Sequence, residues 1–176
     1  MADDMTQALR AIAHPLRLQI LSLLTGADLS AAEVARELDV THANASYHLR
    51  VLRDAGQLEV ASEERIRGGV AKRYRHPWRQ QPRKGKVASA DREAYARAMA
   101  EELVRRVRLA VPGRRALFAD AELWVDAEDA VAVRETAQEA SNRLHDAARP
   151  PRTEGTQRIA MTIAVFEMRT DDGEES

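Results

Sequence analysis

The chain has 176 residues, enough for one compact core or for a small domain with an appended element. Apolar residues make up 44% and charged residues 31% of it, a mixture typical of soluble globular proteins. It contains no cysteine, which excludes disulfides, thiolate metal sites and cysteine nucleophiles. No apolar run approaches the roughly 18 to 20 residues that a membrane span needs, and the acidic start does not resemble a secretory signal. Composition therefore predicts a cytoplasmic protein without a membrane partner.

The net charge of −1 conceals an asymmetry along the chain. Residues 1–86 carry a net charge of +4, and residues 87–176 carry a net charge of −5. Within the first part, residues 65–86 hold nine basic residues and no acidic one. A basic segment on a nearly neutral chain indicates a local contact with a polyanion, although a solvated linker would have the same composition.

The first elements are predicted from helical periodicity and from capping residues. Residues 5–13 predict a short helix, and Pro15 fits the first turn of a second helix that ends at Gly26. Ser30 and Glu33 have the spacing of a capping box, in which each side chain bonds the backbone of the other residue. A third, short helix is therefore expected to begin directly after Ser30.

The next stretch predicts a helix followed by a β-hairpin. Thr41 is the expected cap of a helix over residues 42–55, which Gly56 closes. Residues 57–63 alternate between apolar and polar side chains, and residues 70–76 form the expected return strand. The turn between these strands is basic and contains two glycines, so the hairpin has a basic tip.

The second half is predicted to hold two helices and two short strands. Residues 89–111 and 127–148 have helical periodicity, with Asp126 as a cap of the second helix. Residues 122–126 and 159–168 have the composition of strands. The acidic end of the chain, from residue 171 to 176, has the composition of a disordered tail.

These elements predict an α+β protein that is mainly helical and has three parts. Residues 1–76 would form a winged helix-turn-helix domain that binds DNA, and residues 77–88 a basic linker. Residues 89–176 would form a long dimerisation helix with a small C-terminal α/β layer.

The helix over residues 42–55 has the two faces that a DNA-reading helix needs. At about 100° per residue, Ala45, Leu49 and Leu52 form a narrow apolar stripe. The opposite side carries small, polar and basic residues, which can contact base edges in the major groove. The residues of this helix assigned to DNA binding are His42, Ala43, Asn44, Ser46, Tyr47, His48 and Arg50.

Two histidines of this helix leave alternatives open. His48 lies beside the apolar stripe, so a structural hydrogen bond to the preceding helix competes with a DNA contact. His42 could face phosphate or solvent.

The hairpin over residues 57–76 forms the predicted wing. Arg65 and Arg67 near its tip are expected to enter the minor groove, with a mobile, solvated tip as the alternative. On the return strand, three basic residues are expected to contact phosphates and so to give affinity without sequence choice: Lys72, Arg73 and Arg75.

Residues 5–76 resemble a known family of DNA-binding proteins. Ala13-His14-Pro15-Leu16-Arg17, Leu29 to Ala35 and Ser46 to Leu52 are similar in order and spacing to the ArsR-type winged-helix repressors. The resemblance implies a homodimer that represses transcription at a two-fold site in double-stranded DNA and releases it on a signal. It also implies dimerisation through the first helix and the helix after the wing, here residues 5–13 and 89–111.

The signal that would release DNA is not encoded in a recognisable motif. Many members of that family sense metals, but this chain has no cysteine, no histidine within residues 89–111 and no histidine pair at helical spacing. We therefore predict no metal site and no cofactor. An apolar pocket between the C-terminal layer and the dimerisation helix would admit a small-molecule effector, whereas a purely structural layer is the alternative.

Nothing in the sequence indicates catalysis. The chain lacks a phosphate-binding glycine loop, a nucleophile elbow and a zinc-protease helix. It is predicted not to be an enzyme. The alternative to a DNA-binding regulator is a winged-helix protein-interaction module that works through its acidic C-terminal half.

Overall fold

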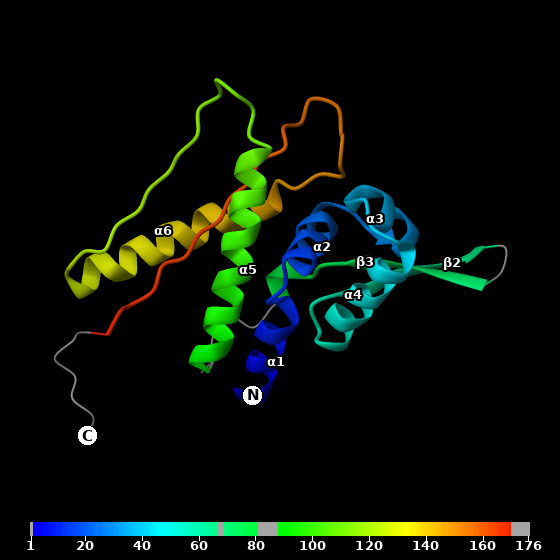
Figure 1. Cartoon of the computed structure of the whole chain (residues 1–176), viewed down its shortest axis with the longest axis horizontal. Helices are drawn as coiled ribbons and strands as arrows, with labels where there is room; N and C mark the ends of the chain where they lie inside the picture. The colour runs from blue at the N-terminus through cyan, green and yellow to red at the C-terminus, as the bar shows by residue number, and fades with distance from the viewer. Residues whose placement is uncertain (1, 67–68, 81–87, 170–176) are drawn as a thin grey trace.

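The computed structural model describes residues 2–66, 69–80 and 88–169. Two parts are visible in Figure 1: a helical body with a projecting β-hairpin, and two long helices linked by extended segments. The helices of the first part are α1 (Ala2–Ile12), α2 (Pro15–Gly26), α3 (Ala31–Leu38) and α4 (His42–Asp54). A single 3-10 turn, η1 (Trp78–Gln80), lies in the predicted linker, and the second part holds α5 (Ser89–Arg108) and α6 (Ala127–Asp146).

Local caps begin the helices of the first part where the sequence predicts them. His14 caps α2, because its Nδ1 accepts a hydrogen bond from the backbone N–H of Leu16 at 3.1 Å. The capping box of α3 is complete, with Ser30 and Glu33 each bonding the backbone of the other. Thr41 caps α4 by accepting from the Asn44 backbone N–H at 3.2 Å.

The sheet has three antiparallel strands in the order β1-β3-β2. The hairpin of β2 (Glu59–Ile66) and β3 (Gly69–Arg75) is the predicted wing, although Arg67 and Gly68 of its tip lie outside the described residues. The third strand, β1 (Leu29–Ser30), was not predicted, because two residues are too few to show alternation. The predicted fold class is confirmed: a mainly helical α+β winged helix-turn-helix.

The main apolar cluster of the core lies in this winged helix. Ile20 and Leu24 of α2, Val34 of α3, and Leu49 and Leu52 of α4 are almost fully buried together. Burial of each such side chain contributes about 1.5 to 3 kcal/mol to the stability of the fold. Because α3 and α4 both contribute to this cluster, it sets the angle between them. In the second part, α5 packs against α1 and α2 of the same chain.

Two expectations for the second half are wrong. Residues 122–126 and 159–168 form no strand, so α6 stands without the sheet of the predicted α/β layer. A strand needs a neighbour to accept its backbone hydrogen bonds, and neither segment lies edge to edge with another in this chain. Helix α5 also ends at Arg108, three residues before its predicted end at Val111. Val111 precedes Pro112, and a proline disfavours helical backbone angles in the residue before it. The acidic tail, residues 171–176, lies outside the described residues.

No helix in the described part of the chain combines the length and apolar character needed to cross a membrane.

Candidate nucleic-acid interface

Helix α4 has one face in the core and one face in solvent. The predicted stripe of Ala45, Leu49 and Leu52 is buried. Tyr47, on the opposite side, is 54% exposed. The other exposed residues of the predicted DNA face are His42, Ala43, Asn44 and Arg50, whereas Ser46 is half-buried. The exposed face therefore offers an amide, a guanidinium, a phenol and a small apolar side chain, which are groups that can contact base edges.

Arg50 folds back on its own helix. Its Nε donates to the backbone carbonyl of Ser46, one turn earlier, at 3.3 Å. This contact is exposed, so the guanidinium can leave it at small cost to reach a base or a phosphate.

The structure does not place His48 on the exposed face. It is buried at the contact between α4 and α2, with its ring centroid 4.7 Å from that of His14. The alternative of a hydrogen bond to the preceding helix is not realised either, because its Nδ1 has no partner among the described residues. Burial, then His14 and Arg17, lower the pKa of His48, which favours the neutral ring. The position of His48 on the helix, beside the apolar stripe, already indicated that its side chain could face the core.

Arg73 of β3 joins the wing to the capping box of α3. Its guanidinium lies 3.0 Å from Glu33 Oε2 and donates to the backbone carbonyl of Asp28 at 2.6 Å. Glu33 also accepts from the Ser30 backbone N–H at 2.8 Å. Burial of Glu33 opposes ionisation, but the hydrogen bonds from Ser30 and Arg73 together outweigh it and lower its pKa. Arg73 therefore holds the wing against the first helix of the helix-turn-helix.

Carboxylates also face the other basic residues of β3. Lys72 Nζ lies 3.3 Å from Glu63, and Arg75 Nε lies 3.1 Å from Asp28 and 3.9 Å from Glu59. These are exposed pairs, worth about 0 to 1 kcal/mol each, so a phosphate can replace the carboxylate.

The wing therefore has less unpaired positive charge than its basic residues alone predicted. Two of the acidic residues lie on β2, directly across the hairpin, where Glu63 is in register with Lys72 and Glu59 with Arg75. Counting outward from the glycine turn would have revealed the pairing of Glu63 with Lys72, whereas a bulge between Val60 and Ser62 shifts the register before Glu59. Arg65 is exposed and forms no ion pair with any described residue, while Arg67 lies outside the described residues.

The arrangement of these elements suits a DNA duplex. In Figure 1 the β2–β3 hairpin projects beyond the helical body, beside α4. A helix with a free polar face and an adjacent hairpin can contact a major groove and the neighbouring backbone together. Within the described residues, no group of three or more histidine, aspartate and glutamate side chains could hold a metal ion.

Comparisons with known proteins give two similarities. A family described as "Helix-turn-helix domain" matches residues 12–61. The chain is also similar to the transcriptional repressor SdpR of Bacillus subtilis (strain 168), with 36% identity over 61 residues. That similarity covers 35% of this chain and 64% of the relative. The chain thus contains a helix-turn-helix domain, formed by α3 and α4 within the matched residues.

Proposed function

We propose that the chain is a sequence-specific DNA-binding transcriptional regulator that acts as a homodimer on a two-fold site. Helix α4 would enter the major groove, and the β2–β3 wing would contact phosphates or the minor groove. The observation that carries this proposal is the exposed polar face of α4, opposite its buried stripe, within a helix-turn-helix domain.

Repression is the proposed direction of regulation. The similar Bacillus subtilis protein is a transcriptional repressor, and the motifs around His14, Ser30 and Tyr47 resemble the ArsR-type repressors. The helix-turn-helix match over residues 12–61 and the resembling motifs lie in the winged helix, residues 1–76, which we assign to DNA binding. Residues 77–88 are the proposed linker and residues 89–176 the proposed dimerisation part.

Different residues would supply sequence choice and affinity. Asn44 suits adenine and Arg50 suits guanine, while Ala43 and Tyr47 can contact thymine methyl groups. Ser46 would also face bases, and Arg65 and Arg67 would enter the minor groove. Phosphates would be contacted by His42, Lys72 and Arg75. Arg73 would position the wing through Glu33 and would not touch DNA.

Selection of bound duplexes from a random DNA library, repeated across a salt series, tests the proposal. We expect a two-fold sequence to be enriched, with log K falling linearly with log salt by about 0.9 for each phosphate contacted. Arg75→Ala should reduce that slope by about 1 and weaken all sequences equally. Arg97→Ala, which removes an exposed arginine of α5, is the matched control and should leave the slope unchanged. Absence of any enriched sequence would contradict the proposal.

One observation favours a second candidate, a protein-interaction module working through the C-terminal half. Many apolar side chains of that half are exposed, including Leu117, Phe118 and Trp124. This candidate predicts no DNA selection by the whole chain, so the same experiment separates the two functions.

A further inference from the structure

The second half of the chain exposes its apolar side chains. From residue 103 to residue 169 no described residue is buried. Leu117 is 92% exposed and Trp124 is 88% exposed, although such residues normally lie inside proteins. The exposed large apolar residues of this half include Leu103, Val104, Val107, Leu109, Val111, Phe118, Leu123, Val125, Ile159, Val165 and Phe166. Apolar surface on this scale marks an interface.

The total surface shows how much area is left uncovered. The chain has 13847 Å² of accessible surface, whereas a compact monomer of 19.6 kDa has about 8,600 Å². The excess of about 5,000 Å² is larger than the roughly 1,000 to 2,500 Å² that each protomer of an obligate homodimer buries. A second copy packed as in an obligate homodimer would therefore cover up to about half of this excess area.

Two extended segments of this half also lack backbone partners. No hydrogen bond from backbone to backbone joins residues 115–125 or 157–169 to another described residue. Both segments have strand composition, and along the second one Ile159, Met161 and Ile163 alternate with smaller side chains. A strand with both edges open is a template for pairing with another chain.

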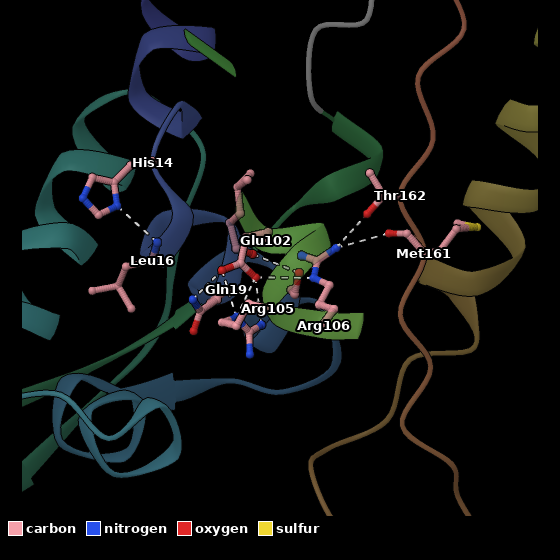
Figure 2. Close-up of polar contacts among 10 residues, drawn as sticks. His14, Leu16, Gln19, Glu102, Arg105, Arg106, Met161 and Thr162 are labelled. Carbon is pink, nitrogen blue, oxygen red and sulfur yellow. Dashed lines mark hydrogen bonds and ion pairs between the residues drawn. The ribbon is translucent and has the colours of Figure 1, made fainter. Parts of the chain in front are cut away.

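The second of these segments already lies beside α5. Arg106 of α5 donates from Nη1 to the Met161 carbonyl oxygen and to Thr162 Oγ1, each at 3.3 Å. Figure 2 shows this segment passing alongside the helix, with Arg106 between them. Next to the exposed Val104 the surface of α5 is hollowed between Ala100 and Arg108 and is open to solvent. The segment is thus placed against α5 while its backbone remains open to a partner.

Charge favours a second copy over DNA or another polyanion. Residues 87–176 carry a net charge of −5, which would repel a phosphate backbone. Within that half, the basic stretch of Arg108, Arg114 and Arg115 precedes an acidic stretch over residues 120–129. The structure shows no ion pair of either stretch with a described residue. Two copies related by a two-fold axis would satisfy both stretches reciprocally, because each copy supplies one of each.

We propose that two copies of this chain pair through their C-terminal halves and share a β-sheet, to which residues 121–126 and 157–168 of each copy contribute strands. The apolar side chains of these strands would cover the exposed face of α5. The inference rests on the proposed homodimer and extends its contact surface beyond α1 and α5, which pack on each other within one chain.

Light scattering and hydrogen exchange on the full chain test this inference. We expect the wild type at micromolar concentration to have twice the 19.6 kDa mass of one chain. Trp124→Glu and Phe166→Glu should each raise the dimer dissociation constant at least ~100-fold, because a carboxylate would be buried without a partner. Val70→Glu, at an exposed apolar position of the wing, is the matched control and should leave the mass unchanged. The backbone amides of residues 121–126 and 157–168 should be protected from hydrogen exchange in the dimer and should exchange freely in both acidic variants. Circular dichroism of the two variants checks that the winged helix remains folded.

Three outcomes would overturn it: a monomeric wild type, a dimer that both acidic variants leave intact, or protected amides in a monomer, which would mean that the sheet forms within one chain. The duplex selection keeps the two proposals apart. A dimer without a selected site contradicts only the DNA-binding function. A monomer with a selected site contradicts the homodimer and its shared sheet, and leaves sequence-specific DNA binding standing.

Discussion

At the residue scale, the proposed sequence choice depends on Asn44 and Arg50 of α4. Both side chains are exposed on α4, and Arg50 is held only by its bond to Ser46. Arg50→Ala should cost about 1 to 3 kcal/mol on the preferred site and much less on unrelated DNA, because a bidentate contact to guanine carries sequence information. Competition binding with mutated sites measures this difference. An equal loss on all sequences would show that Arg50 contacts phosphate instead.

Ser30 is the residue on which the start of α3 depends. Its Oγ accepts from the Glu33 backbone N–H at 3.4 Å, and its N–H donates to the Glu33 carboxylate at 2.8 Å. Ser30→Ala should lower the free energy of unfolding by about 1 kcal/mol, because one backbone N–H of the first turn loses its acceptor. Urea denaturation measures the change, with Ser62→Ala on β2 as the exposed control. Equal stability of the two variants would contradict the importance of the cap.

At the scale of elements, a buried carboxylate fastens α5 to α2. Glu102 of α5 is 1% exposed and accepts from Gln19 Nε2 of α2 at 2.6 Å, and Arg105 donates to it from the next turn (Figure 2). Burial opposes ionisation of Glu102, but the hydrogen bonds from Arg105 and Gln19 and the charge of Arg106 outweigh it and lower its pKa. The contact between the two parts of the chain is therefore an ionised one.

This lowered pKa makes the stability of the chain depend on pH. A carboxyl whose pKa is lower in the folded state stabilises the fold above its unfolded pKa of about 4.5, and the contribution is lost as the pH falls through the folded value. Glu102→Gln should cost about 1 to 3 kcal/mol at pH 7 and flatten the decline in stability below pH 4.5. Denaturation over pH 3 to 7 measures both effects. Glu93→Gln, which removes an exposed ion pair with Arg97, is the control. If stability depended on pH in the same way in Glu102→Gln and in wild type, Glu102 would not be the stabilising ionised group.

At the scale of the whole molecule, the end of α6 docks on the winged helix. Arg152 pairs with Glu37 of α3 at 2.6 Å, and the ring of His145 lies 5.1 Å from that of Trp78. At Gly26, the last residue of α2, an added Cβ would lie 2.6 Å from the Arg149 carbonyl oxygen. Only glycine allows this approach, so the contact between the two halves depends on it.

Gly26→Ala should therefore loosen residues 147–152 from α2. Tryptic cleavage after Arg152 is expected to become at least several-fold faster, because the added methyl group displaces the Arg149 backbone and exposes the peptide more often. Ser22→Ala changes a solvent-facing residue of the same helix and should leave the rate unchanged. Equal cleavage rates for Gly26→Ala and wild type would show that the docking does not require the close approach.

The elements of the winged helix were largely predictable because their signals are local. The caps at His14, Ser30 and Thr41 act within three residues, and the stripe through Leu49 follows from helical geometry alone. The C-terminal end of α5 was misplaced and the two-residue β1 was missed, since a helix end near proline and a very short strand depend on weak preferences.

The sequence by itself determined the helix-turn-helix, the wing, the exposed polar face of α4 and the exclusion of cysteine chemistry. Only the tertiary structure decided that His48 is buried against His14, that Arg73 positions the wing, and that Glu102 is held inside. It also showed that residues 159–168 have strand composition without a strand partner in their own chain. The physical reason is the same in each case. Caps and periodicity act over a few neighbouring residues, whereas ion pairs, burial and strand pairing join residues that only folding or a second chain brings together.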